Sequence, residues 1–212
     1  MSGAFVALCG VAGWAIGFLL RPVVDRVTAE RAPGRAPTGR SRPAAPLTAA
    51  LFGATAWVFG WTWSLPAYLA LAAFLVVLTL VDVDTKTLPR RIVWAAGATG
   101  VALLAGASVV AGEPQRIIHA TIGATVAFVF LCALSILARG GFGFGDVRLG
   151  AVLGWYLGWQ SLSLAMTGLM AAFVVSAVTG VVLMVFGRAG RRTEVPFGPA
   201  LASGAFLVLL AA

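Results

Sequence analysis

The chain has 212 residues, of which 60% are hydrophobic and 10% are charged, and its mean hydropathy is +0.99. Soluble domains are nearer half apolar and a quarter charged, so this composition excludes an ordinary soluble protein and indicates a polytopic membrane protein. The net charge of +8 would suggest a nucleic-acid ligand in a soluble protein. In a membrane protein, basic residues collect in cytoplasmic loops instead, and we expect no nucleic-acid partner.

Apolar runs long enough to span a bilayer follow one another along the chain. A transmembrane helix needs roughly 20 apolar residues, so the long runs 47–83 and 147–187 each predict two helices. The expected breaks lie near residues 63–66 and 158–160. Residues 21–46, rich in arginine and proline, predict a flexible basic cytoplasmic loop. The expected helices are 4–20, two within 47–83, 92–112, 117–138, two within 147–187, and 197–212.

The charges of the connections support this count of eight helices. The connections placed inside carry 14 of the 15 lysines and arginines, and those placed outside carry only Arg116. This alternation is the pattern of the positive-inside rule. The sequence therefore predicts an all-α, eight-span protein of the cell membrane, with both termini outside and one domain over residues 1–212.

Two of the seven acidic residues stand at the ends of apolar runs. Asp82 closes the third predicted span and Asp146 opens the sixth, so the topology places both at the cytoplasmic face. A carboxylate at a membrane boundary indicates function, although solvation of a helix end or helix capping by Asp146 would also explain it. Two neighbouring carboxylates share a proton, activate water and protonate a scissile amide, as in aspartic proteases.

Other hydrolytic chemistries lack the residues that they need. A histidine-rich zinc site needs two or three imidazoles, and His119 is the only histidine. A serine nucleophile needs a base, and the only lysine, Lys86, has no clear serine partner. We therefore expect neither a metal nor a cofactor.

Two motifs carry a family resemblance. Residues 81–89 (VDVDTKTLP) place Asp82 seven positions before Pro89, and residues 143–149 (GFGDVRL) contain a GxGD motif that ends at Asp146. Together they resemble the type IV prepilin peptidase family, the GxGD membrane aspartic proteases. The segments 17–24, 154–160 and 195–199 also resemble that family, so the similarity extends over nearly the whole chain.

The resemblance implies a role for each matched residue. Asp82 and Asp146 correspond to the two catalytic aspartates, and Gly143 and Gly145 would let the backbone approach the substrate in conformations closed to other residues. Supporting positions are Asp84, Pro89 and Arg148. Asp84 would point about 200° away from Asp82 on a continuing helix, and Arg148 is also explained as a charge that sets the topology.

The resemblance also implies a substrate: the leader of a prepilin or pseudopilin, cut at the cytoplasmic boundary of the bilayer. Long members of the family carry a cysteine-bearing insert between the first two spans, associated with N-methylation. Residues 21–46 are short and have no cysteine. We therefore expect the short form of the family, without methyltransferase activity.

Three alternative functions remain at the level of sequence. An ion-coupled transporter would use Asp82 and Asp146 as relays, although both acids are predicted at one face and no inverted repeat is evident. A GxGD protease with other membrane-protein substrates would share the two aspartates. A catalytically silent assembly factor would share the motifs without turnover.

Overall fold

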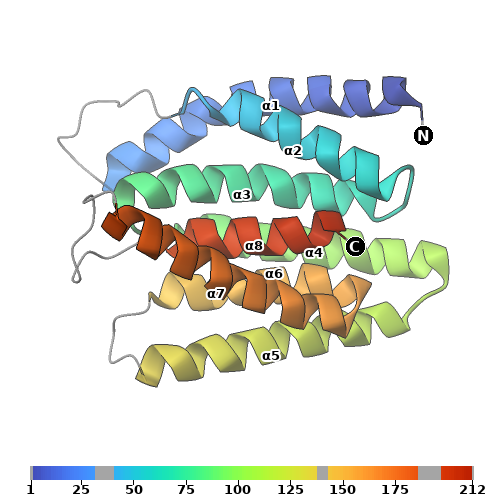
Figure 1. Cartoon of the computed structure of the whole chain (residues 1–212). Coiled ribbons are helices and arrows are strands. Elements are labelled where there is room, and N and C mark those ends of the chain that lie inside the picture. The colour runs from blue at the N-terminus through green and yellow to red at the C-terminus, as the bar shows by residue number, and fades with distance from the viewer. Residues whose placement is uncertain (1, 32–40, 138–142, 186–196, 212) are drawn as a thin grey trace. The chain divides into compact units, whose positions relative to one another are not determined.

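The computed structural model describes residues 2–31, 41–137, 143–185 and 197–211, and their regular structure is entirely α-helical (Figure 1). The helices are α1 (Gly3–Arg31), α2 (Ala44–Phe59), α3 (Leu65–Thr85), α4 (Arg90–Ala111), α5 (Gln115–Leu137), α6 (Phe144–Gln160), α7 (Leu162–Val185) and α8 (Phe197–Ala211). Five of them are long and apolar enough to cross a membrane: α1, α3, α4, α5 and, over Leu162–Thr179, α7. The helices α2 and α8 are apolar but shorter.

The division of the two long apolar runs is confirmed. The helix α2 ends at Phe59, and α3 begins at Leu65 with Pro66 in its first turn, where a proline costs no intrahelical hydrogen bond. The second break is a single residue, Ser161, whose extended backbone ends α6 before α7 begins. The sixth helix is also longer than the apolar pattern suggested, since it begins at Phe144.

The chain forms two compact units, Met1–Pro114 and Gln115–Ala212. In the first unit, α1 and α2 run antiparallel and approach closely through glycine. A Cβ atom on Gly13 would lie 2.7 Å from the Thr48 carbonyl oxygen, and one on Gly17 would lie 2.6 Å from the Ala45 Cα. Small residues that let helix backbones touch are a common basis of helix association in membranes.

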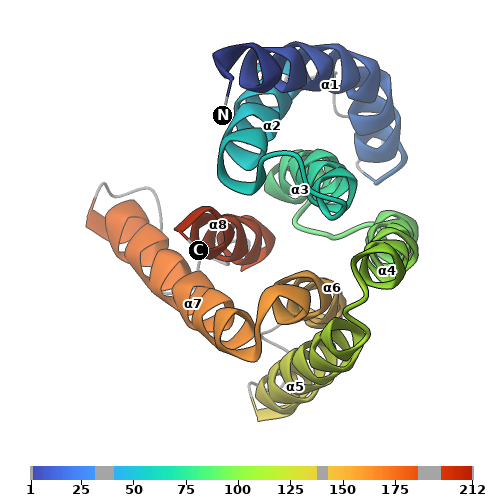
Figure 2. The same ribbon diagram turned by 90° about the vertical axis from the view of Figure 1, so that its right-hand side faces the viewer.

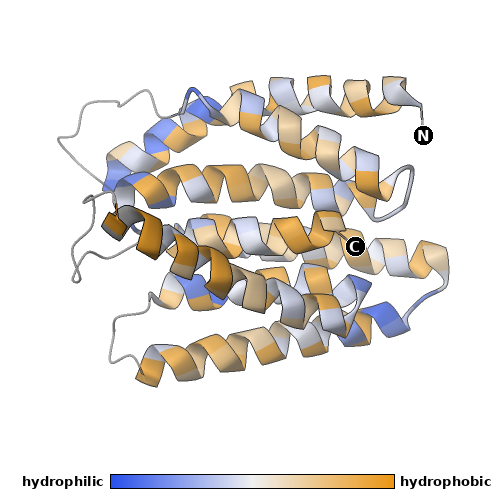
Figure 3. Cartoon of the chain, viewed as in Figure 1, coloured by the Kyte–Doolittle hydropathy of each residue, from blue (hydrophilic) through white to orange (hydrophobic). Residues whose placement is uncertain are grey.

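The expected loop over residues 21–46 is wrong at both of its ends. The helix α1 continues through Pro22 to Arg31, and α2 already begins at Ala44; residues 32–40 lie outside the described part. Figures 1 and 2 show that α1 bends partway along its length, as expected of an internal proline. Figure 3 shows that hydrophilic residues gather in its second half.

Apolar packing explains why this second half of α1 stays helical. Leu20, Val24 and Val27 recur at helical spacing, and they pack together with Val77 and Val81 of α3. Val24 is only 1% exposed. A stripe of this spacing buries one face of a helix while the charged residues between its members stay in water.

The second unit is built around an antiparallel pair of helices, α5 and α6. A Cβ atom on Gly154 would lie 2.5 Å from the Gly123 carbonyl oxygen, and one on Gly158 would lie 2.8 Å from the His119 carbonyl oxygen. The helix α8 packs on α7 in the same way, since a Cβ atom on Gly204 would lie 2.5 Å from the Ala172 backbone nitrogen. The position of α6 therefore depends on close contact with the α5 backbone.

Candidate active site

Asp82 lies in the last turn of α3 and is 4% exposed. Its Oδ2 atom is buried, and the residue before it, Val81, is fully buried against α1. The helix ends three residues later at Thr85, and the backbone N–H of the capping residue Lys86 donates to the Asp82 carbonyl oxygen at 2.7 Å. The chain therefore holds this carboxylate at a well-defined helix end.

Asp84 and Pro89 lie in the same connection but in different surroundings. Asp84 is half-buried and lies two residues beyond Asp82 on α3. Pro89 is buried. Pro89 caps α4 with its carbonyl oxygen, which accepts the backbone N–H groups of Ile92 and Val93 at 3.0 and 3.1 Å. The proline thus fixes where α4 starts after the Asp82 segment.

Asp146 occupies the first turn of α6 and is partly exposed. Its backbone N–H donates to the Gly143 carbonyl oxygen at 3.0 Å. The partial positive charge of a helix N-terminus stabilises a carboxylate at this position, whereas the last turn of a helix, where Asp82 lies, carries the opposite partial charge. The two aspartates therefore occupy electrostatically different helix ends.

Neither GxGD glycine has a backbone conformation closed to other residues, and their expected approach to the substrate stays a prediction. Gly143 has φ −68° and ψ 131°, which any residue adopts, and Gly145 lies in α6 and is not among the positive-φ glycines of the described residues. The absence of a side chain at Gly143 matters for the space around Asp146. A Cβ atom there would lie 3.3 Å from the Asp146 Oδ2 atom, so the missing side chain leaves room for the carboxylate.

Arg148 makes an aromatic contact. Its guanidinium carbon lies 4.7 Å from the ring centroid of Phe144, and that ring meets Phe128 of α5 edge to face at 6.5 Å. The contact ties the first turn of α6 to α5. The guanidinium of Arg148 therefore packs on a ring of its own helix, and that ring in turn packs on α5.

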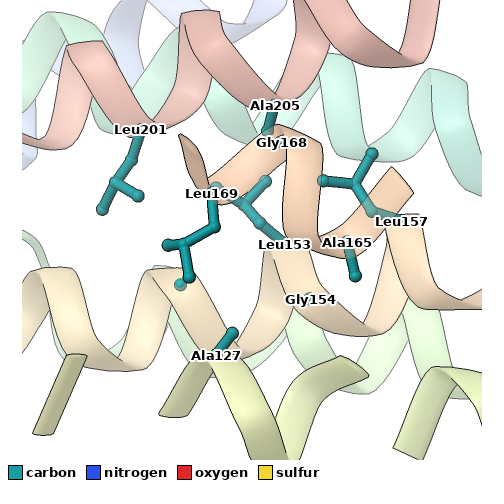
Figure 4. A pocket seen from close by; sticks show the side chains of 10 residues that line it. Ala127, Leu153, Gly154, Leu157, Ala165, Gly168, Leu169, Leu201 and Ala205 are labelled. Carbon is teal, nitrogen blue, oxygen red and sulfur yellow. The ribbon is translucent and has the colours of Figure 1, made fainter. Parts of the chain in front are cut away.

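An apolar pocket lies elsewhere in the second unit (Figure 4). It is lined by Ala127, Gly150, Leu153, Gly154, Leu157, Ala165, Gly168, Leu169, Leu201 and Ala205. These residues come from α5, α6, α7 and α8, and none of the expected site residues is among them. The pocket carries no titratable group and fits helix packing better than catalysis.

Each unit thus gathers a part of the expected site. The first unit brings together Asp82, Asp84 and Pro89, and the second brings together Asp146, Gly143, Gly145 and Arg148. Across the described residues, no group of three or more histidine, cysteine or acidic side chains could hold a metal ion.

Sequence reasoning missed a hydrogen-bonded group beside Asp82. Arg31 Nη1 donates to Thr87 Oγ1 at 3.0 Å, and the hydroxyl oxygens of Thr87 and Thr85 lie 2.9 Å apart. The two threonines flank Lys86, the only non-glycine residue with positive φ in the described part of the chain. The available signal was the polar segment Asp84-Thr85-Lys86-Thr87 after the apolar run.

Comparison with known proteins identifies relatives over most of the chain. The chain is 32% identical to the prepilin leader peptidase/N-methyltransferase of Pseudomonas aeruginosa, over 83% of this chain and 60% of that protein. Identity to the Bacillus subtilis protein of the same name is 31%, over 79% of this chain and 65% of that protein. The chain therefore spans less than two thirds of the length of these relatives. No solved structure matches it.

The sequence profile of the type IV leader peptidase family matches residues 69–185. This range is more than half of the chain and includes both Asp82 and Asp146. The long apolar helices and the similarity to these bacterial peptidases together support a multi-pass membrane protein. On this evidence, the chain belongs to the type IV leader peptidase family.

Proposed function

We propose that this chain is a membrane aspartic endopeptidase that removes the leader of a prepilin or pseudopilin, with Asp82 and Asp146 as its two catalytic carboxylates. The observation that carries the proposal is that the family match includes two aspartates at helix ends, one of them 4% exposed in an apolar unit. Burying a carboxylate costs several kcal/mol unless it is compensated. A position of this kind is therefore a strong candidate for function.

The helix ends suggest different roles for the two acids. Asp146, stabilised as a carboxylate in the first turn of α6, is proposed as the base that takes a proton from water while the oxygen attacks the scissile carbonyl carbon. Asp82 is proposed as the acid that gives its proton to the leaving amide nitrogen, so that the peptide bond breaks and the proton count balances.

The neighbouring residues are proposed to shape this site. Gly143 leaves space for the Asp146 carboxylate, and Pro89 fixes the segment that follows Asp82. Asp84, Gly145 and Arg148 are proposed as supporting positions.

The site is proposed to face the cytoplasm in an eight-span protein of the cell membrane with both termini outside. In the first unit, the Arg31–Thr87 hydrogen bond places the end of α1 beside the connection between α3 and α4. Both of these segments are rich in basic residues, which favour the cytoplasmic side. A substrate whose leader stays inside while its apolar helix enters the bilayer would present its cleavage point at this boundary.

The proposal covers peptide cleavage only. The names of the relatives include N-methyltransferase, but residues 21–46 contain no cysteine. Since the resemblance associates methylation with a cysteine-bearing insert in this region, we leave methylation out of the proposed function.

The test is leader cleavage of a co-expressed prepilin from the same genome, followed by the size of the prepilin on a gel. The parent chain is compared with Asp82→Asn and Asp146→Asn, and with Asp25→Asn as a matched control on an exposed acid of α1. Membrane levels of all four proteins are measured by immunoblotting.

We expect the parent and the Asp25→Asn variant to cleave, and each of the other variants to lose activity by at least about a thousandfold. Cleavage that survives one of these changes would remove that aspartate from the mechanism. Absence of cleavage by the parent, across several prepilins, would refute the proposed substrate class.

A further inference from the structure

The second half of α1 lies against the helix end that carries Asp82. Val24 and Val81 are 1% and 0% exposed, and they belong to one apolar cluster with Val77. Val81 directly precedes Asp82. A contact at this position restrains the last turn of α3 from the side of α1.

A chain of hydrogen bonds continues from this contact. Arg31 Nη1 donates to Thr87 Oγ1 at 3.0 Å, Thr87 Oγ1 lies 2.9 Å from Thr85 Oγ1, and Thr85 Oγ1 donates to the Val81 carbonyl oxygen at 2.9 Å. Each hydroxyl can accept one of these bonds and donate the next, so the Thr87 hydroxyl donates to the Thr85 hydroxyl oxygen. The chain therefore links α1 to the peptide group that joins Val81 to Asp82.

The backbone between the two threonines is held in an unfavourable conformation. Lys86 has φ 51° and ψ 30°, in the left-handed region, which residues with a Cβ atom adopt at an energetic cost. Such a conformation persists where the surroundings over-determine it. Here its N–H donates to the Asp82 carbonyl oxygen at 2.7 Å, and the side chains on both sides of it are hydrogen-bonded to each other.

We propose that Arg31, Thr85 and Thr87 form a positioning clamp that holds the left-handed turn at Lys86 and, through it, the carboxylate of Asp82. The clamp residues act through Asp82 and touch no reacting atom. This inference rests on the proposed function, because the clamp matters for turnover only where Asp82 is catalytic. The bonds from Thr87 to Arg31 and to Thr85 are exposed, and the bond from Thr85 to the Val81 carbonyl oxygen is partly buried.

The central variant is Thr87→Val, which keeps the shape of the side chain and removes its hydroxyl. Thr87→Ser keeps the hydroxyl and should restore function. The matched control is Thr121→Val in α5, an exposed threonine whose hydroxyl donates only to its own helix, at the Ile117 carbonyl oxygen. All variants are purified as the full chain in lipid nanodiscs.

The kinetic readout is cleavage of a purified prepilin, with kcat and KM measured separately. We expect Thr87→Val to lower kcat by about tenfold, with little change in KM, because a misplaced catalytic group slows the chemical step. Thr87→Ser and Thr121→Val should stay close to the parent. An unchanged kcat in Thr87→Val, or a loss confined to KM, would overturn the inference.

Hydrogen exchange gives a readout that needs no activity. The backbone amide of Lys86 donates to the Asp82 carbonyl oxygen. Its hydrogen exchange should be faster in Thr87→Val than in the parent, and unchanged in Thr121→Val. Unchanged exchange would overturn the clamp even in an active enzyme. If the parent chain cleaves no prepilin but the Thr87→Val variant still exchanges faster, the proposed function and the catalytic purpose of the clamp are refuted. The structural effect of the clamp on the turn would stand in that case.

A double variant tests the step through Lys86. Glycine adopts the left-handed region without the Cβ penalty, so Lys86→Gly should make the turn less dependent on the clamp. We expect Thr87→Val to lower kcat by a smaller factor in the Lys86→Gly background than in the parent. An equal or larger loss would show that the turn is not what the clamp holds.

Discussion

Replacing Gly154 by alanine should separate α5 from α6. The new Cβ atom would lie 2.5 Å from the Gly123 carbonyl oxygen and 2.9 Å from the Ala127 Cβ atom, whereas ordinary contact begins at 3.4 Å. The difference between 2.5 and 3.4 Å requires the helices to move apart by about 0.9 Å, since the carbonyl belongs to rigid backbone. Overpacking of this kind costs about 1–3 kcal/mol, or roughly 3–10 °C in Tm for a chain of this size.

The matched control is Gly106→Ala in α4, where a Cβ atom would meet nothing within 4 Å. Alanine is the better helix former by about 1 kcal/mol, so the control should melt at or slightly above the parent temperature. Thermal unfolding in detergent, followed by tryptophan fluorescence, compares the two variants directly. If Gly154→Ala melted as high as Gly106→Ala, the close α5–α6 contact would be wrong.

Three further predictions follow from single positions. Val24→Ala should lower the free energy of unfolding by about 1–2 kcal/mol, because Val24 is only 1% exposed. The control Val23→Ala, at a position that is 40% exposed, should change the free energy of unfolding little. Equal melting temperatures of the two variants would contradict the packing of α1 on α3. Gly143→Ala should keep the parent melting temperature, since the φ angle of Gly143 is −68°. It should reduce leader cleavage, because the new Cβ atom would lie 3.3 Å from the Asp146 Oδ2 atom. Full cleavage activity would refute a role of Gly143 in leaving space for this carboxylate. In a background without native cysteines, Glu30→Cys should react with an impermeant thiol reagent only after the cells are opened; labelling of intact cells would contradict a cytoplasmic end of α1.

Helix number and breaks could be predicted because they depend on local chemistry. A bilayer limits helix length, so the run 47–83 had to break, and Pro66 indicated where. The helix ends at Asp82 and Asp146 follow from the same pattern. These features need no knowledge of packing.

The second half of α1 could not be predicted from composition. Arginine and proline suggested a loop, but the spacing of Leu20, Val24 and Val27 satisfies helical packing on α3. The partner of that stripe, Val77 with Val81, is distant in sequence, so only the folded chain shows that the stripe is buried. The same holds for the Arg31–Thr87 bond and for the space that Gly143 leaves.

The proposed function requires Asp82 and Asp146 to act as a single pair of carboxylates. Its most direct test is cross-linking in a chain without native cysteines, in which Asp82→Cys and Asp146→Cys are combined and treated with a short thiol cross-linker in membranes. The control pair combines Asp84→Cys with Asp146→Cys. Asp84 lies about 200° away from Asp82 around the same helix. Efficient cross-linking of the first pair within one chain, well above the control, is the predicted result; no cross-link, or one equal to that of the control, would contradict a shared site.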